Sequence, residues 1–204
     1  RKYLKHGSRR IHHKKLRCIN YFSFMRYVAL LRGINVGGNN IIKMVELKAC
    51  FEKMGCTNVS TYIQSGNVVF DAKEKKRETL TKNIEHTLSK QFGYTAVVVI
   101  VSHAELKKMV STAPNGFGTK PDLYRYDVVF IKPPLKSAAA IQDIRTRDGV
   151  DLVVAGRGVL YFSRLIKNVS KSYMSKIVLL PVYKQMTIRN WNTTSKILGL
   201  MEKE

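Results

Sequence analysis

A hairpin is encoded in Val59-Ser60-Thr61-Tyr62-Ile63-Gln64-Ser65-Gly66-Asn67-Val68-Val69-Phe70-Asp71. The runs on either side of its centre are rich in β-branched and aromatic residues, which is typical of strands. Gly66 and Asn67 tolerate the positive φ that a tight connection requires. We therefore expect strands at 59–63 and 68–71 that pair as antiparallel neighbours.

The segments around this hairpin complete a larger unit. A mostly apolar run at 27–31 predicts a buried strand, and 43–54 has apolar residues at helical spacing before Gly55. After the hairpin, 74–92 predicts an amphipathic helix and 96–101 predicts a central strand. Strand, helix, hairpin, helix, strand is the βαββαβ order, which packs two helices on one face of a four-stranded sheet.

The same order recurs in the second half of the chain. Ser102-His103-Ala104-Glu105 forms a capping box that begins a linking helix. Later strands are expected at 124–131, 152–155 and 159–163, and later helices at 137–147 and 170–180. The fold class expected is α+β, a tandem duplication of ferredoxin-like (βαββαβ) subdomains with antiparallel sheets. The first subdomain, with the linking helix, is expected at 25–114 and the second, with a C-terminal helix, at 115–204.

The chain is strongly basic, because 36 Lys and Arg against 14 Asp and Glu give a formal charge of +22. Residues 1–24 hold eight of these bases and no acid, and Met25 follows them. We interpret 1–24 as a basic leader that is non-native or disordered, the alternative being an arm that binds nucleic acid.

Composition also limits where the protein acts. A hydrophobic content of 45% suits a globular core, and no apolar run approaches the roughly 20 residues of a membrane-spanning helix. The three cysteines form no CxxC pair, which suits a reducing compartment. We expect a cytoplasmic protein without a membrane partner and without a metal site.

A glycine- and asparagine-rich loop, Arg32-Gly33-Ile34-Asn35-Val36-Gly37-Gly38-Asn39-Asn40, is the first candidate site. Its glycines let backbone amides approach a ligand, Arg32 can bind two oxygens at once, and the start of the following helix favours an anion. The loop lacks the spacing of a P-loop or of a dinucleotide turn. The alternative is a turn in which glycine serves geometry and asparagine caps backbone groups.

The second candidate is Thr187-Ile188-Arg189-Asn190-Trp191-Asn192-Thr193. We expect Thr187 to cap a helix whose Trp191 faces inward, which leaves Arg189 and the amides as a polar girdle. Such groups are costly to bury unpaired, so they either join the two halves or face a polar ligand.

Three blocks of this sequence, 28–38, 62–70 and 187–193, resemble the signature blocks of the domain of unknown function 1697, a family of uncharacterised bacterial proteins. The resemblance spans residues 25–204, and the leader has no counterpart in it. It implies two ferredoxin-like subdomains and no established activity. The polar character of the blocks leads us to expect one ligand site, formed by Arg32, Asn35, Gly37, Gly38, Ser65, Asn67, Arg189, Asn190 and Asn192.

Several classes of function remain open. Beyond the leader, the only histidines are His86 and His103, and neither adjoins a candidate nucleophile, so the sequence assigns no catalytic residue and no cofactor. We predict binding of a small anionic or polar molecule. The alternative is a nucleic-acid-binding module that uses the basic surface, although the RNP-type aromatic pattern is absent. A noncatalytic interaction protein is the third possibility, and the sequence does not indicate the oligomeric state.

Overall fold

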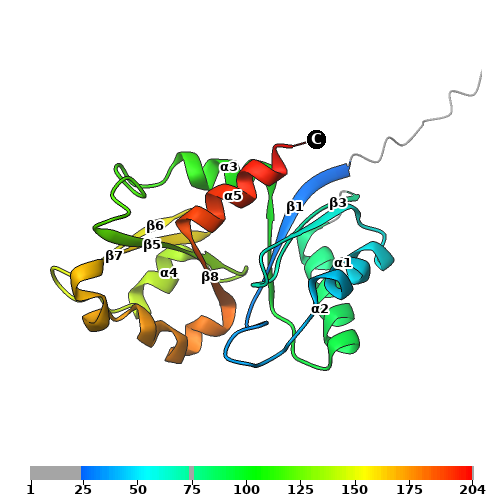
Figure 1. The fold of residues 1–204 in the computed structure, drawn as a ribbon, viewed down its shortest axis with the longest axis horizontal. Helices are drawn as coiled ribbons and strands as arrows, with labels where there is room; N and C mark the ends of the chain where they lie inside the picture. The colour runs from blue at the N-terminus through cyan, green and yellow to red at the C-terminus, as the bar shows by residue number, and fades with distance from the viewer. Residues whose placement is uncertain (1–23, 74–75, 204) are drawn as a thin grey trace, which may run out of the picture.

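Two four-stranded antiparallel sheets form the frame of the molecule in the computed structural model, which describes residues 24–73 and 76–203 (Figure 1). The α+β class is as expected. The predicted leader lies outside the described residues except for Phe24, with which the first strand begins.

The first sheet has the strand order β2-β3-β1-β4. Its strands are β1 (Phe24–Leu31), β2 (Thr57–Tyr62), β3 (Asn67–Lys73) and β4 (Val98–Ser102). The helices α1 (Met44–Lys53) and α2 (Arg77–Phe92) bury their apolar faces against one side of it. Phe51 of α1, for example, packs against Phe70 of β3 with ring centroids 5.1 Å apart.

The second sheet has the order β6-β7-β5-β8. Its strands are β5 (Tyr124–Ile131), β6 (Asp151–Gly156), β7 (Val159–Leu165) and β8 (Met186–Asn190). One face carries the short helix α4 (Ser137–Ala140), the 3₁₀ turn η1 (Ile141–Asp143) and a series of 3₁₀ turns, η2 (Ile166–Lys171), η3 (Met174–Leu179) and η4 (Pro181–Gln185).

The prediction of an α-helix at 170–180 is wrong, because this segment forms 3₁₀ turns. Ser172 Oγ accepts a hydrogen bond from the Met174 amide (3.0 Å), and Asp151 Oδ2 accepts one from the Tyr173 amide (2.9 Å). These side chains compete with the helical pattern for the backbone donors. The helix expected at 137–147 is likewise shorter than expected, since its last described turn ends at Asp143.

Thr187 does not cap a helix, because it lies in β8. The cap of α5 (Trp191–Met201) is Asn190, whose side chain accepts from the Asn192 amide at 2.9 Å. Arg189 therefore belongs to a strand and not to a helical girdle.

The inner faces of the two sheets share one core. Val28 and Val69 of the first sheet and Val128 and Phe130 of the second belong to the same buried cluster. The helices α3 (His103–Ser111) and α5 complete this cluster, and Figure 1 shows them side by side along its upper edge. The packing predicts that the two halves stabilise each other.

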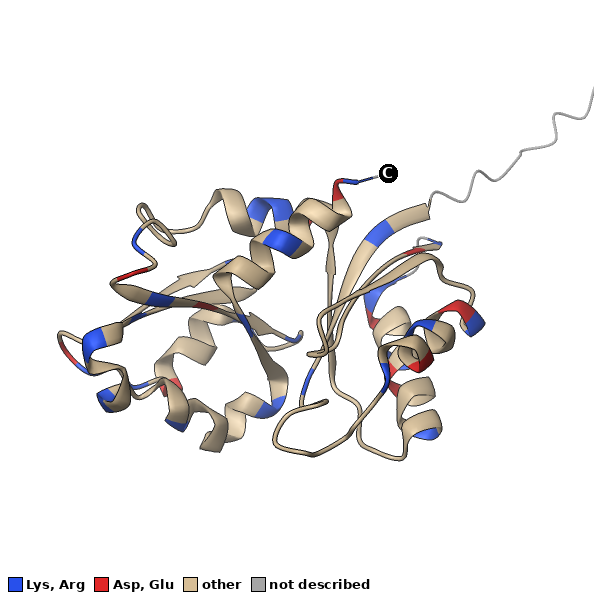
Figure 2. Ribbon diagram, viewed as in Figure 1, with Lys and Arg blue, Asp and Glu red and all other residues tan. Residues whose placement is uncertain are grey.

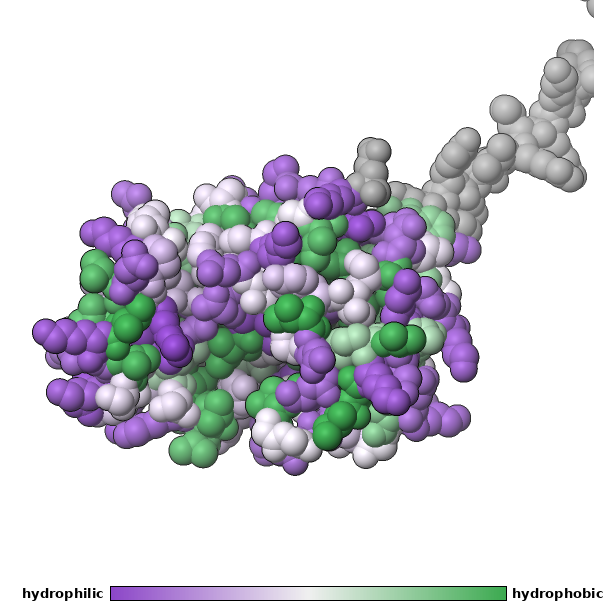
Figure 3. All heavy atoms as spheres, in the orientation of Figure 1, coloured by the Kyte–Doolittle hydropathy of each residue, from purple (hydrophilic) through white to green (hydrophobic). Residues whose placement is uncertain are grey.

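The surface shown in Figure 3 intersperses hydrophobic residues with hydrophilic ones. Among residues 24–73 and 76–203, no helix combines the length and the apolar character needed to cross a bilayer.

Candidate functional site

The three sequence blocks meet where β8 approaches the end of β1 and the β2–β3 turn. Arg189 of β8 makes the connection. Its Nη2 donates to the carbonyl oxygens of Leu31 (2.8 Å), Ser65 (2.9 Å) and Gly66 (3.3 Å). These acceptors belong to the first sheet and its hairpin, so one side chain joins the two halves.

The remaining donors of Arg189 are also satisfied inside the protein. Its Nε donates to the Asn67 Oδ1, and its Nη1 donates to Thr187 Oγ1 and to the Ile188 carbonyl, both at 2.8 Å. The residue is only 7% exposed, and burial lowers its pKa to about 10. Arg189 is therefore charged at neutral pH and engaged by oxygens of the chain itself.

Ser65 and Asn67 shape the turn that Arg189 contacts. Asn67 is fully buried and donates to the Tyr62 carbonyl (3.0 Å) and to Ser65 Oγ (3.1 Å). Between them, Gly66 has φ +73°, and an added Cβ would lie 2.8 Å from Leu31 Cβ and Ile34 Cδ1. Only glycine fits this close approach.

Asn35 fastens the glycine-rich loop to the hairpin. Its Nδ2 donates to the carbonyls of Gln64 (2.8 Å) and Ile42 (3.0 Å), while its Oδ1 accepts from the Ile42 amide (2.8 Å). Gly37 and Gly38 lie beyond it at the exposed tip of the loop, with φ of +58° and +78°. Asn35 is thus occupied internally, whereas the tip faces outward.

Arg32 differs from Arg189 in its surroundings. Its guanidinium lies over the Tyr183 ring, 4.7 Å from the centroid, and its Nη1 donates to the Lys184 carbonyl at 3.5 Å. The side chain is half-buried, and no carboxylate in the described part of the chain forms an ion pair with it. One face of this cation is therefore available to an external anion.

Asn190 and Asn192 lie apart from this group. Asn190 donates to the Tyr126 carbonyl at 3.1 Å and caps α5 through the Asn192 amide. Within residues 24–73 and 76–203, no hydrogen bond joins either side chain to the glycine-rich loop.

Sequence reasoning missed Tyr183 and Lys184, which support Arg32 from a 3₁₀ turn more than 150 residues away in sequence. No local pattern links them to β1. The described residues contain no group of three His, Cys, Asp or Glu side chains that could hold a metal ion.

Comparison with known proteins adds a family and a fold. The model of the family described as "Protein of unknown function (DUF1697)" matches residues 25–161. The conserved bacterial protein SP0830 from Streptococcus pneumoniae has a similar structure, with a TM-score of 0.75 and 26% identity over 88% of this chain and 100% of that one. No curated protein matches the chain.

Proposed function

The chain belongs to the DUF1697 family of proteins of unknown function, and we propose that it binds a small anionic ligand at the outer side of its signature blocks, beside Arg32. The family comprises uncharacterised conserved bacterial proteins, so the proposal rests on the geometry of this chain. The observation that carries it is the Arg32 guanidinium, which is stacked on Tyr183 without a carboxylate partner in the described part of the chain.

The surroundings of Arg32 suit an anion. An arginine held over an aromatic ring keeps its planar set of donors in place, which favours two-pronged binding of a carboxylate or phosphate. Gly37 and Gly38 bring main-chain amides to the loop surface without side chains in the way. Lys184, on the turn below, adds an exposed positive charge.

In this proposal the nine residues have two roles. Arg189, Asn67, Ser65 and Asn35 hold the loop, the hairpin and β8 together, and Asn190 and Asn192 begin α5. Arg32, Gly37 and Gly38 contact the ligand. The internal hydrogen bonds of Arg189 and Asn67 support this division.

The proposal includes a tandem duplication of ferredoxin-like units at 25–114 and 115–204. The matching strand orders β2-β3-β1-β4 and β6-β7-β5-β8 support it. So does the equal length of the two first strands, Phe24–Leu31 and Tyr124–Ile131. A cytoplasmic location remains part of the same proposal.

The test is a thermal-shift screen with inorganic phosphate, nucleotides, sugar phosphates and dicarboxylates, followed by calorimetric titration of any compound that raises the melting temperature. Arg32→Gln is expected to abolish the shift while leaving the melting temperature of the free protein unchanged. The matched control is Arg125→Gln, which removes an exposed arginine of β5 and should leave binding intact.

Retention of binding by Arg32→Gln would refute the proposal. A salt titration distinguishes the nucleic-acid alternative. If an oligonucleotide binds through six phosphates, the logarithm of its binding constant falls with the logarithm of the salt concentration with a slope of about −5. Figure 2 shows lysine and arginine distributed over both halves of the molecule, which does not favour one nucleic-acid track.

A further inference from the structure

A pocket of about 400 Å³ lies on the second sheet, at the outer end of the core that the two sheets share. Strands β5, β6 and β7 form its floor, and the segment 114–120, which leads from α3 to β5, forms its wall. None of the residues assigned above to the anion site lines it. Its volume falls within the range of about 300–1,000 Å³ that is typical of pockets for small molecules. The pocket is therefore large enough to enclose a second ligand.

The strand register determines which side chains form the floor. Tyr126 of β5 lies opposite Ser163 of β7, which lies opposite Leu152 of β6, and in the next row Tyr161 lies opposite Val154. Residues opposite each other in antiparallel strands share a face of the sheet, and all five line the pocket. Leu152 is 61% exposed and Val154 is 36% exposed, although both are apolar. The β6 side of the floor is thus an apolar surface that no described part of the chain covers.

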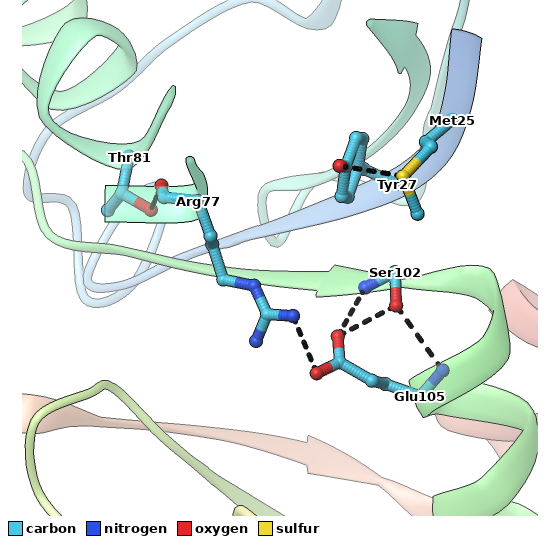
Figure 4. Close-up of polar contacts among 6 residues, drawn as sticks. All are labelled: Met25, Tyr27, Arg77, Thr81, Ser102 and Glu105. Atoms are coloured by element: carbon cyan, nitrogen blue, oxygen red, sulfur yellow. Dashed lines mark hydrogen bonds and ion pairs between the residues drawn. The ribbon is translucent and has the colours of Figure 1, made fainter. Parts of the chain in front are cut away.

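The wall of the pocket is joined to the sheet through α3. This helix begins at the capping box of Ser102 and Glu105, and Arg77 contacts Glu105 with Nη2 and Oε1 2.6 Å apart (Figure 4). Near the other end of the helix, Tyr161 Oη donates to the Met109 carbonyl at 2.6 Å. Figure 1 shows the segment that forms the wall running from the end of α3 to the start of β5. The wall therefore starts from a helix that is held at both ends.

Phe117 holds the wall against the sheet. Its ring meets those of Tyr126, Tyr161 and Trp191 edge-on, with centroids 4.9, 5.3 and 5.1 Å apart. Its amide donates to the Pro114 carbonyl at 2.9 Å, which closes a turn. Aromatic contacts of this kind are favourable beyond the area that they bury. The wall is thus formed without a ligand, and Trp191 is in contact with it.

Two hydroxyl groups on the floor have no partner. Ser163 and Tyr126 are each only 8% exposed, and neither hydroxyl forms a hydrogen bond with another residue that the structure describes. Both residues line the pocket, and both oxygens remain accessible from it. A hydroxyl both donates and accepts, and a polar group left unpaired inside a protein costs free energy. A ligand that supplies a donor or an acceptor at this point removes that cost.

We propose that this pocket binds a small planar aromatic heterocycle. The apolar part of its ring system lies on Leu152 and Val154 beside Phe117, and its ring N–H and C=O groups form hydrogen bonds with the hydroxyls of Ser163 and Tyr126. A flat molecule suits a floor made of a sheet and a wall whose central side chain is an aromatic ring. An apolar lining with a few convergent polar groups is the usual character of such sites.

Other occupants fit this pocket less well. An RNA strand binds largely through cations at its phosphates, and Lys120 is the only lysine or arginine among the described residues that line the pocket. An alkyl chain would cover Leu152 and Val154 but would leave Ser163 and Tyr126 without partners. A planar heterocycle covers the apolar floor and supplies hydrogen bonds to both hydroxyls.

The test uses two probes, quinazolin-4-one and hypoxanthine, with calorimetric titration and the NMR signal of the Trp191 indole N–H, the single indole of the chain. We expect saturable binding of at least one probe below about 1 mM and a shift of that signal on binding. Ser163→Ala and Tyr126→Phe should each weaken binding about fivefold or more, because each removes one hydrogen bond. The matched control, Ser175→Ala at an exposed position of η3, should change the affinity by less than about twofold. Arg32→Gln should have no effect, which separates this test from that of the anion site.

Ligand variants test the same contacts on the unaltered protein. 3-Methylquinazolin-4-one, which lacks the ring N–H, should bind about fivefold more weakly than quinazolin-4-one, and piperidin-2-one, which keeps the lactam but lacks the aromatic plane, about tenfold more weakly. Failure of both probes to bind, equal affinity of the two hydroxyl variants and the control, or an unchanged indole signal would each overturn the proposal. So would oligonucleotide binding that is lost in Ser163→Ala, or a dimer in sedimentation experiments that Leu152→Asp dissociates.

Discussion

Replacing Arg189 with methionine is expected to lower the free energy of unfolding by about 3 kcal/mol. Methionine keeps an unbranched apolar stem in the buried position, so the change removes the guanidinium without opening a large cavity. Asn67 Oδ1 and the carbonyl oxygens of Leu31 and Ser65 then lose the partner that Arg189 provides. The Gly66 carbonyl keeps its hydrogen bond from the Leu31 amide at 2.8 Å.

The magnitude follows from two opposing contributions. The three acceptors that the first half of the chain contributes, left without a partner, cost about 6 kcal/mol at about 2 kcal/mol each. Thr187 Oγ1 and the Ile188 carbonyl lose the same partner, but a hydroxyl can rotate and the Ile188 contact is only part-buried, so they add little. Removing the buried charge returns about 3 kcal/mol, because desolvation lowers the pKa of Arg189 to about 10 from an ordinary value of 12.5. The net loss is therefore about 3 kcal/mol. This is a large fraction of the free energy of unfolding of a typical folded domain, which is about 5–15 kcal/mol.

The assay is urea denaturation followed by the fluorescence of Trp191, the only tryptophan of the chain, which lies beside the altered residue. With a slope of about 2 kcal/mol per M, the midpoint should fall by about 1.5 M. Arg189→Lys should restore little of the lost midpoint. A single ammonium group cannot reach the acceptors of the first sheet and those of β8 at once, as the guanidinium does. Arg125→Met, at an exposed position of β5, is the control. A midpoint for Arg189→Met within about 0.3 M of this control would refute the assignment of Arg189 as the link between the sheets.

Three further results are expected. Burial alone would raise the pKa of Glu105, but hydrogen bonds from Ser102 and Arg77 bring it below its ordinary value of 4.5. The stability advantage over Glu105→Gln should therefore be complete above pH 4.5 and decline as the pH falls through the lowered pKa of the folded state. An advantage that does not change with pH in urea denaturation would contradict this. Gly118→Ala should destabilise the protein by about 2 kcal/mol and alter tryptophan emission, because φ is +84° and the new Cβ would lie 2.2 Å from Trp191 Nε1. Gly199→Ala is the control, since a Cβ at this position of α5 meets no other atom within 4 Å and should stabilise the protein by about 0.5–1 kcal/mol. Burial raises the pKa of the Cys50 thiol, so iodoacetamide should label Cys50 only in urea, as judged by peptide mass spectrometry; rapid native labelling would show that α1 opens readily.

Local patterns predicted much of the α+β frame. The strand at 124–131 has the bounds expected of it, and the capping box of Ser102 and Glu105 is confirmed by hydrogen bonds in both directions. Gly93 ends α2 in the left-handed conformation, which glycine adopts readily, directly after the helix predicted at 74–92. In each case the determining interactions lie within a few residues, where periodicity and turn chemistry can be read.

The candidate site was less accessible to such reasoning. Met186-Thr187-Ile188-Arg189 alternates apolar and polar residues, a strand signal that the expectation of Thr187 as a helix cap obscured. Most partners of Arg189 are main-chain oxygens, one of them 158 residues away in sequence, and a carbonyl carries no side-chain signature. Whether an arginine is buried among carbonyls or exposed on a tyrosine depends on tertiary contacts alone.

The matching order of the two sheets gives Arg189 a particular meaning. Val128 of β5 pairs with Arg189, and Val28, at the same place in β1, pairs with Val101. Equivalent positions thus hold a valine of the shared apolar core in one half and a buried cation in the other. Apolar contact between two similar sheets is non-directional and does not by itself fix how they are aligned. The hydrogen bonds of Arg189 form in only one alignment of the two sheets, because the guanidinium has to donate to oxygens of Leu31, Ser65 and Asn67 at the same time. Burying this charge costs free energy, but its hydrogen bonds fix how the two sheets are aligned. That alignment determines the position of Arg32 relative to Tyr183 and Lys184 of the second half.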